Sequence, residues 1–317
     1  TRFRNVTGVQ TCALPISNRF QNVPRFVVPR DCSRITAFID VGDHLLWFAV
    51  VAWNQTFGGC VLDYGPYPDQ TRTHFHSSAP SPALGDMPEV QGQPADFAIT
   101  RGLAALTARI LGRDYTQEET GAALAVERCL IDANYGPRTD AVYSFVRRYT
   151  GRGNVLPSHG KFYGASSLPM SQYQRRDGEL PGPGWILKPG SGQRGRHVVF
   201  DTNHWKTFLS ERLQTPIGSP RGCLTLYQPE SGAGHWMIAE HCNAEYPVAV
   251  EARGRDRIVQ EWKNRPGRDN HLFDCLVGAT VAASMAGVRW SPGGTDEPAK
   301  RKRVKLSELY AQKNGGR

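Results

Sequence analysis

The sequence contains no hydrophobic run long enough to cross a membrane. Its longest apolar stretches, such as Leu45 to Trp53, have the length of a strand and fall far short of the roughly 20 residues that span a bilayer. Glycine and proline follow no period, and 39% of the residues are hydrophobic, which excludes a collagen-like or wholly disordered chain. The sequence therefore predicts a globular protein without a membrane partner, and its 317 residues are enough for a full core.

Common metal-binding and nucleotide-binding motifs are also missing. The seven cysteines form no Cys-x-x-Cys pair and no Cys/His cluster at zinc-finger spacing, so we expect buried free thiols. His74 and His76 have no further ligands nearby, and a surface loop is the preferred interpretation of their segment. No Gly-x-x-x-x-Gly-Lys-Ser/Thr motif occurs. At 188–197 two glycines have a similar spacing, but Arg196 and His197 replace the Lys and Ser/Thr and a strand follows. Nucleotide binding is therefore rejected there.

Positive charge is in excess. With 38 Lys and Arg against 29 Asp and Glu, the formal net charge is +9, which favours a polyanionic partner. A Gly/Pro/Ser-rich, largely irregular insertion at 161–196 is basic, and so is a tail at 291–317 that is predicted to be disordered. Each segment is interpreted either as a phosphate-binding element or as a solvated one. The candidate phosphate-binding residues are Lys161, Arg175, Arg176, Arg194, Arg196, Lys300, Arg301, Lys302 and Arg303.

We interpret the first 17 residues as foreign to the natural protein. Residues 6–17 resemble the translation of a common sequencing-library adaptor, so we treat 1–17 as an artefactual leader and exclude it from the fold. The authentic protein would then begin further upstream. We interpret 18–33 as a linker, 34–290 as one domain that includes the basic insertion, and 291–317 as the tail.

Apolar periodicity and turn signals predict a mixed α/β sheet. Strands are expected at 34–40, 45–53 and 59–64 as an antiparallel meander, followed by a long loop at 66–94. A helix at 96–111, a strand at 123–132, a helix at 139–149 and a strand beginning at 154 come next. After the insertion we expect a strand at 197–200, a helix at 203–213, a strand at 223–227, a helix at 235–245, a hairpin at 248–252 and 257–262, and a helix at 270–286.

Three acids occupy positions at which such a sheet gathers functional side chains. Asp40 ends the first strand, Asp132 ends the strand after the first helix, and Asp274 lies near the start of the last helix. Parallel strand ends open onto one edge of a sheet, where sites in α/β folds collect. Clustered carboxylates suit Mg²⁺ or Mn²⁺, and two such ions activate a water and stabilise the leaving oxygen of a phosphodiester. Each acid taken alone is more often a turn or cap residue.

Four further acids are weighed against this set. Asp43 and Asp63 are alternative ligands, but a hairpin turn and a strand end are the preferred explanations of their positions. Asp269 is interpreted as an acid that caps the N-terminus of the last helix. Glu261 is interpreted as a surface residue of a strand.

Three ordered motifs carry a family resemblance. They are Phe38-Ile-Asp-Val41 with a hairpin ending Leu62-Asp-Tyr-Gly65, then Leu130-Ile-Asp-Ala-Asn-Tyr-Gly136 leading into a helix at 139–147, and Gln260-Glu-Trp-Lys-Asn-Arg-Pro-Gly-Arg-Asp-Asn-His-Leu-Phe-Asp-Cys275. Together they resemble the nuclease domain of phage large terminase subunits of the GpA family, over about 34–287. The family often has Glu where His271 stands and Lys near the position of His159. Neither departure replaces a proposed metal ligand.

The resemblance implies an RNase H-like fold with a five-stranded mixed sheet flanked by helices. It further implies that Asp40, Asp132 and Asp274 hold two Mg²⁺ or Mn²⁺ ions and cut concatemeric double-stranded DNA during packaging. The basic residues above would then bind DNA. The terminase small subunit and the portal are the implied partners, in the cytoplasm of an infected bacterium. We expect no ATPase activity, since no nucleotide-binding loop is present.

Two alternatives remain open from the sequence. One is another RNase H-like nuclease, such as a Holliday-junction resolvase or a transposase. The other is a non-catalytic DNA-packaging or DNA-binding module that keeps the fold with an empty site. Binding of two divalent ions at the three acids would distinguish a nuclease from such a module.

Overall fold

The computed structural model describes residues 16–192, 194–229, 234–251 and 257–289. In these ranges the main sheet has nine strands, and no helix is long and apolar enough to cross a bilayer. The strand order is β12 (Leu224–Leu226), β4 (Gly59–Tyr67), β3 (Leu46–Trp53), β2 (Arg34–Val41), β7 (Arg128–Asp132), β8 (Asn154–Lys161), β11 (His197–Asp201), β10 (Trp185–Lys188) and β9 (Leu180–Gly182). Strands β2, β3 and β4 form the antiparallel meander, whereas β2, β7, β8 and β11 run parallel.

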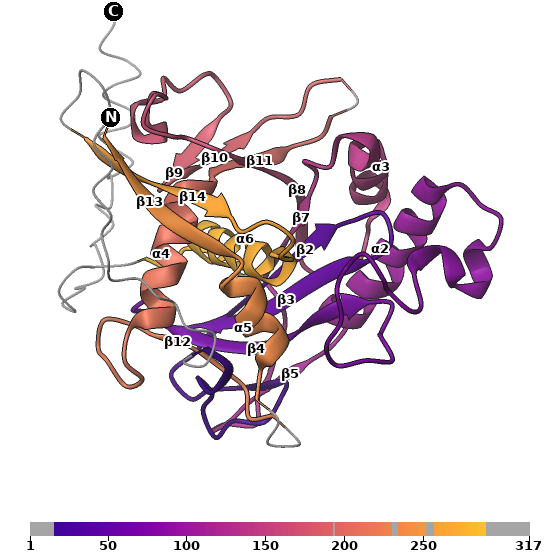
Figure 1. The fold of residues 1–317 in the computed structure, drawn as a ribbon, viewed down its shortest axis with the longest axis horizontal. Coiled ribbons are helices and arrows are strands. Elements are labelled where there is room, and N and C mark those ends of the chain that lie inside the picture. Colours follow the sequence, from indigo (N-terminus) through magenta and orange to yellow (C-terminus); the bar gives the residue numbers. More distant parts are fainter. Residues whose placement is uncertain (1–15, 193, 230–233, 252–256, 290–317) are drawn as a thin grey trace, which may run out of the picture.

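Helices cover both faces of this sheet (Figure 1). Helices α2 (Ala95–Leu111) and α3 (Thr139–Arg148) pack on one face, and α4 (Thr202–Gln214), α5 (Trp236–Cys242) and α6 (His271–Met285) pack on the other. All eight residues of β3 are buried, and they alternate between the two cores. Trp47, Ala49, Val51 and Trp53 face α6, while Leu46, Phe48, Val50 and Ala52 face α2. This alternation follows from the two-residue period of a strand.

The same period decides where the strand-end acids point. In β2, Phe38 belongs to the core under α6, and Ile39 belongs to the core under α2. Leu130 and Ile131 of β7 divide between the two cores in the same way. Asp40 and Asp132 each lie two residues beyond the member that faces α6, so their side chains emerge on the α6 side. The register pairs Ile39 with Ile131, which brings the two acids to the same level of the sheet.

Helix α6 approaches β2 closely because it carries a glycine at the contact. A Cβ atom on Gly278 would lie 1.8 Å from Cδ2 of the buried Phe38 ring. One residue further along α6, the Ala279 carbonyl accepts a hydrogen bond of 2.8 Å from the Thr36 hydroxyl of β2. Gly278 lies one helical turn after Asp274, so this contact also sets the depth at which Asp274 faces the strand ends.

We expect Gly278→Ala to destabilise the protein despite the better helix propensity of alanine. Relief of the helical glycine gains about 1 kcal/mol, whereas the clash with Phe38 costs about 1–3 kcal/mol or more. Chemical denaturation should show a net loss, partly rescued in the double variant Gly278→Ala/Phe38→Leu. Gly85→Ala is the control, because a Cβ there meets no atom within 4 Å. Full stability of Gly278→Ala would contradict this account of the packing.

Several element predictions are confirmed, and the sheet is larger than expected. The meander, the helices at 95–111, 139–148, 202–214 and 271–285, and the hairpin of β13 (Glu245–Glu251) and β14 (Ile258–Asn264) are all present. The expected five-stranded sheet is too small, because β12, β11, β10 and β9 extend it at its two edges. The helix expected to reach 245 ends at Cys242, because β13 begins at Glu245.

The segment at 161–196 is largely irregular, as expected, but it also contains two short strands, β9 and β10. Strands β9 and β10 continue the main sheet, and β10 pairs with β11 in an antiparallel hairpin. Its Glu179 is buried and accepts hydrogen bonds from the Tyr173 hydroxyl at 3.0 Å and the Arg176 backbone N–H at 3.0 Å. Glycine and proline signalled turns in this segment, but the apolar pairs within the short strands were overlooked. The strand expected at 123–132 is likewise two strands, β6 (Ala123–Leu124) and β7.

The segment interpreted as a linker at 18–33 packs against the domain. Strand β1 (Val27–Val28) pairs with β5 (Tyr115–Gln117) in a small second sheet that also contains β6. Arg25 pairs with the buried Asp63 of β4, with 2.9 Å between its Nε and the carboxylate. Ile16, within the excluded leader, is also buried in the core under α6. Residues 1–15 of the leader and the whole tail at 291–317 lie outside the described residues.

Candidate active site

The three predicted acids line one pocket at the carboxyl ends of β2 and β7. Asp40 is the penultimate residue of β2, Asp132 ends β7, and Asp274 lies in the first turn of α6. The hollow has a volume of about 490 Å³. Its polar lining also includes Asp43, Ser77, Asn134, Tyr135, Asn270 and His271. The tertiary structure thus brings together three acids that are separated by 92 and 142 residues along the chain.

Negative charge is concentrated in this pocket. Burial raises the pKa of Asp132 well above its usual value, and the neighbouring carboxylates of Asp40 and Asp274 raise it further. Backbone N–H groups of Asn134 and Ala133 act in the opposite direction. An ionised carboxylate at this position is therefore costly until positive charge compensates it. That is the electrostatic condition under which a cation binds well.

A buried lysine compensates Asp274 from the opposite side. Nζ of Lys206, on α4, lies 2.9 Å from Asp274 and 2.5 Å from the buried carboxylate of Glu245. The Asn270 amide also donates to both acids, at 2.9 Å to Asp274 and 2.7 Å to Glu245. Burial opposes ionisation of Lys206, but the two carboxylates outweigh it and raise the pKa of the lysine. Together these four side chains fix α4, β13 and α6 around one ion-pair network.

Asp274 retains a raised pKa within this network. Burial is the main cause that raises the pKa of Asp274 to about 6, and the negative charges of Glu245 and Asp40 act in the same direction. The positive charge of Lys206 lowers the pKa but does not cancel these effects. Its side chain is still 35% exposed, which leaves an oxygen accessible from the pocket. Asp274 can therefore face a ligand in the pocket while Lys206 holds it from behind.

His271, the first residue of α6, pairs with Asp40. Its Nδ1 lies 2.7 Å from Oδ2 of Asp40, and its ring stacks on Trp47 with 5.3 Å between centroids. Burial opposes protonation, but the hydrogen bond and charge of Asp40 raise the pKa of His271 overall. The next residue, Leu272, donates its backbone N–H to Nδ1 of the buried His241. The start of α6 is thus held against β3 and α5.

His159 approaches the pocket from β8. Its Nδ1 lies 3.1 Å from the Asn134 side-chain oxygen, and its Nε2 lies 2.9 Å from the Tyr143 hydroxyl. Burial lowers the pKa of His159 to about 4, and the nearby His197, Arg194 and Lys161 lower it further. His159 is therefore neutral at physiological pH and positions Asn134, which lines the pocket.

Asp43 and Asp63 have different surroundings. Asp43 lines the pocket, but its carboxylate accepts hydrogen bonds from the Tyr135 hydroxyl at 2.5 Å and Arg138 at 2.9 Å. The bond from Tyr135 is the main cause of the lowered pKa of Asp43. Asp63 is absent from the pocket lining and pairs with Arg25 instead. Asp63 is therefore no pocket ligand, but it lies in the middle of β4 and not at a strand end as expected. Asp43 contributes a fixed negative charge beside the site.

The predictions for Asp269 and Glu261 need correction. Asn270 precedes α6 as its N-terminal cap residue. Asp269 instead accepts hydrogen bonds from the Ser77 backbone at 2.6 Å and the Ser77 hydroxyl at 2.7 Å, tying the loop after β4 to the start of α6. Glu261 is no simple surface residue, because its carboxylate accepts a 2.9 Å hydrogen bond from the Ala165 backbone. Both acids were misjudged because their partners are distant in sequence.

The basic residues of 161–196 are exposed, and the loop at 188–197 is not a nucleotide-binding loop. Lys161, Arg175, Arg176, Arg194 and Arg196 all reach solvent. Residues 188 and 197 are paired across the β10–β11 hairpin, so no helix N-terminus follows the glycines, as the sequence predicted. Lys300, Arg301, Lys302 and Arg303 lie outside the described residues. His74 and His76 are exposed, in accord with a surface loop, and the described cysteines are free thiols.

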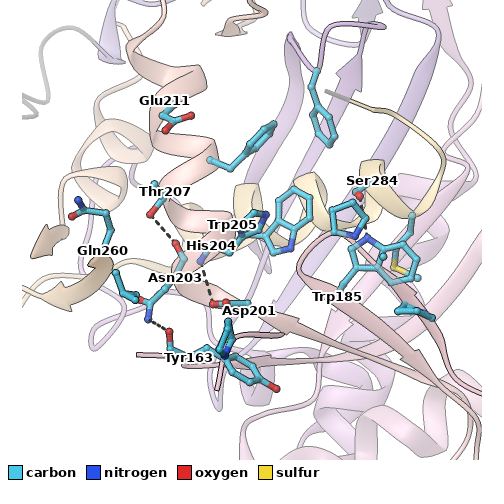
Figure 2. Close-up of a pocket in the computed structure, with 18 of the residues that line it drawn as sticks. Tyr163, Trp185, Asp201, Asn203, His204, Trp205, Thr207, Glu211, Gln260 and Ser284 are labelled. Carbon is cyan, nitrogen blue, oxygen red and sulfur yellow. Dashed lines mark hydrogen bonds between the residues drawn. The ribbon is translucent and has the colours of Figure 1, made fainter. Parts of the chain in front are cut away.

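A larger hollow of about 1020 Å³ lies apart from the acids (Figure 2). It is lined by Trp185 of β10, Trp205 of α4, Gln260 of β14 and Ser284 of α6. Its Asp201 is occupied as the cap of α4, where it accepts a 3.1 Å hydrogen bond from the His204 backbone. Volume alone therefore does not identify the reactive site, because this mainly apolar hollow contains none of the three strand-end and helix acids.

The donor chemistry of the smaller pocket suits a hard divalent cation. Asp40 and Asp132 offer carboxylate oxygens from adjacent parallel strands, and Asp274 offers a third from α6. As the described side chains stand, no three His, Cys, Asp or Glu residues converge closely enough to hold one ion. His271 and Lys206 instead contact Asp40 and Asp274. The acids thus share a pocket whose oxygens would need to turn toward an ion.

Sequence reasoning missed the residues that support the acids. Lys206 and Glu245 carry no motif, and only their contacts with Asp274 reveal them. Asn270 and His271 lie in the third motif but were not assigned supporting roles. Asn134 lies two residues after Asp132, the acid of the second motif. Its side-chain amide donates to the Gly160 carbonyl at 2.6 Å. An Asp-x-Asn pattern at a strand end was the available signal for it.

One comparison with known proteins identifies a relationship. The family model described as terminase large subunit gpA, endonuclease domain, matches residues 5–293. The matched range includes all three acids of the pocket, and it also includes 6–17, the segment that resembles an adaptor translation. Searches of curated proteins and of solved structures gave no significant match.

Proposed function

Because the chain belongs to the gpA endonuclease family of phage terminase large subunits, we propose that it is a metal-dependent endonuclease of double-stranded DNA. The observation that carries the proposal is the shared pocket of Asp40, Asp132 and Asp274. Its raised carboxylate pKa values favour binding of a cation. The biological reaction would be the cutting of concatemeric phage DNA during packaging, with the terminase small subunit and the portal as partners in the host cytoplasm.

The sheet order supports an RNase H-like assignment. Strands β4, β3 and β2 form an antiparallel meander, and β7 and β8 continue it in parallel with β2. The first and fourth of these strands along the chain, β2 and β7, are neighbours and carry Asp40 and Asp132 at or next to their last residues. We therefore propose that these five strands are the RNase H-like centre, and that the four outer strands are additions to it.

In the proposed mechanism, Asp40 and Asp132 hold Mg²⁺ or Mn²⁺ ions, with Asp274 as the third carboxylate. Two bound ions would supply the charge that activates a water and stabilises the leaving oxygen of the phosphodiester. Lys206 and Asn270 hold the carboxylate of Asp274 in place from behind. His271 positions Asp40 through their 2.7 Å contact, and Asn134 is positioned by His159. Exposed Lys161, Arg175, Arg176, Arg194 and Arg196 are proposed to contact DNA phosphates.

A plasmid-nicking assay tests this function. The purified chain should convert supercoiled plasmid to nicked and linear forms with Mg²⁺ or Mn²⁺, and it should leave the plasmid intact in EDTA. The nicking activity lost in EDTA should return when excess Mg²⁺ is added, because the acids of the site stay in place in the folded protein. Cleavage of equal rate in EDTA would contradict the metal dependence.

A second candidate is a DNA-packaging module without catalytic activity. The contact of Lys206 with Asp274 favours it, since an ammonium group already compensates one of the acids. Calorimetric titration with Mn²⁺ separates the two candidates. A module of this kind should bind DNA yet show neither Mn²⁺ uptake nor nicking, and that outcome would replace the nuclease proposal.

A further inference from the structure

Two aromatic side chains lie exposed beside the candidate active site, and each is paired with a cation. Phe162 is 53% exposed and Tyr246 is 37% exposed. Nζ of Lys263 lies 5.5 Å from the centre of the Phe162 ring, and the guanidinium carbon of Arg265 lies 4.9 Å from the centre of the Tyr246 ring. We call Phe162, Tyr246, Lys263 and Arg265 the rim surface. None of its members lines the pocket of the acids.

The rim surface is connected to both sides of that pocket. On one side, Phe162 follows β8 two residues after Gly160, whose carbonyl accepts the hydrogen bond from the pocket residue Asn134. On the other side, Tyr246 follows Glu245, which shares Lys206 and Asn270 with Asp274. Two residues of strand span about 7 Å. The rim surface therefore begins within one or two residues of the groups that hold Asp132 and Asp274.

The β13–β14 hairpin presents Tyr246 and Lys263 on one face. Its register places Tyr246 directly opposite Lys263, and directly opposed residues of an antiparallel pair share a face. Trp262 lies on the other face, where it is buried and donates to the Thr207 hydroxyl at 3.0 Å. This buried tryptophan fixes the hairpin on α4. The exposed face is thereby held rigidly next to the pocket.

Charge on the rim surface favours an anionic occupant. Lys263 and Arg265 are both exposed, and Lys161 precedes Phe162. The nearby acid Glu261 is already engaged, because it accepts hydrogen bonds from the Ala165 backbone at 2.9 Å and from Lys263 at 3.0 Å. Exposed aromatic rings with basic neighbours are typical of surfaces that contact nucleic-acid backbones and bases.

We propose that the rim surface binds the sugar-phosphate backbone of DNA next to the phosphate that enters the pocket. Lys263 and Arg265 pair with two phosphates, and Phe162 and Tyr246 pack against the sugars and bases between them. This inference rests on the proposed function for its substrate, DNA. Beside Phe162, which follows β8, it adds Tyr246, Lys263 and Arg265 of the hairpin region to the proposed DNA contacts of the 161–196 segment and the tail.

The test measures binding apart from cleavage. Affinity for a short fluorescent DNA duplex is measured by anisotropy in EDTA over a range of KCl concentrations. Each phosphate contact contributes about 0.9 to the slope of log affinity against log salt, so Lys263→Gln/Arg265→Gln should reduce the slope by up to about 1.8. The control Arg101→Gln/Arg148→Gln removes the same charge from exposed positions on α2 and α3, on the other side of the sheet. It should leave the slope unchanged.

A second variant separates the aromatic contribution from charge. Phe162→Ala/Tyr246→Ala should weaken binding while leaving the salt slope at the wild-type value, because no charge is removed. An unchanged slope in the Lys263/Arg265 variant, or a reduction equal to that of the control, would overturn the inference. If the wild-type chain bound no duplex, both the inference and the proposed function would fail. If it bound DNA with the expected slopes but did not nick it in Mg²⁺, only the proposed function would fail.

Discussion

Asp40→Asn, Asp132→Asn and Asp274→Asn are each expected to abolish Mg²⁺-dependent nicking of plasmid DNA. Each substitution keeps the volume of the side chain and removes a negative charge from the pocket that all three acids line. Loss of a metal ligand should remove several kcal/mol of transition-state stabilisation, and about 1.4 kcal/mol corresponds to a tenfold loss of rate. Single-turnover nicking rates should therefore fall by orders of magnitude.

Stability separates this prediction from simple unfolding. Burial and the charge of Asp40 raise the pKa of Asp132, so the folded state disfavours the ionised form that prevails as pH rises above that pKa. A neutral Asn relieves this penalty. At pH 7 in EDTA, Asp132→Asn should unfold at a urea concentration equal to or higher than that of the wild type.

The matched control is Asp114→Asn. Asp114 is an exposed acid that pairs with the exposed Arg152, with 2.7 Å between its carboxylate and the guanidinium group. Its substitution should leave nicking and stability unchanged, because exposed ion pairs contribute little. Wild-type nicking by any of the three pocket variants would remove that residue from the active site.

Lys206→Met is expected to cause the largest loss of stability. Its ammonium group is buried between Glu245 and Asp274, at 2.5 Å and 2.9 Å. Methionine fills similar volume but leaves both carboxylates without their cation. Removal of one partner from a buried ion pair costs about 3–5 kcal/mol. Urea unfolding in EDTA should show a loss of this size in the free energy of unfolding.

A second substitution should restore part of that loss. In Lys206→Met/Glu245→Gln, Asp274 is the one partner of Lys206 that keeps its charge. The double variant should therefore be more stable than Lys206→Met alone. Lys161→Met is the control, since Lys161 is exposed and its loss should change stability by less than about 0.5 kcal/mol. If Lys206→Met retained wild-type stability, the ion-pair network could not be what holds α4 to α6.

The local sequence contains the information for individual elements and for the three acids of the site. Runs of β-branched, aromatic and other apolar residues predicted β2 and β3, helical spacing predicted α2 and α3, and a run of small residues predicted α6, because these signals act between residues close along the chain. Asp40 and Asp132 were found because each lies at the end of a predicted strand, and Asp274 because it lies near the start of the last predicted helix. Family motifs then supported all three.

Tertiary structure decided which side chains act together. The contact of His271 with Asp40 joins residues 231 apart, and that of Lys206 with Asp274 joins α4 to α6. No local pattern specifies these pairs, since they depend on how the helices are placed on the sheet. The short strands β9 and β10 were missed for the same reason, because the pairing of β9 with β10 and of β10 with β11 stabilises them more than their own composition does.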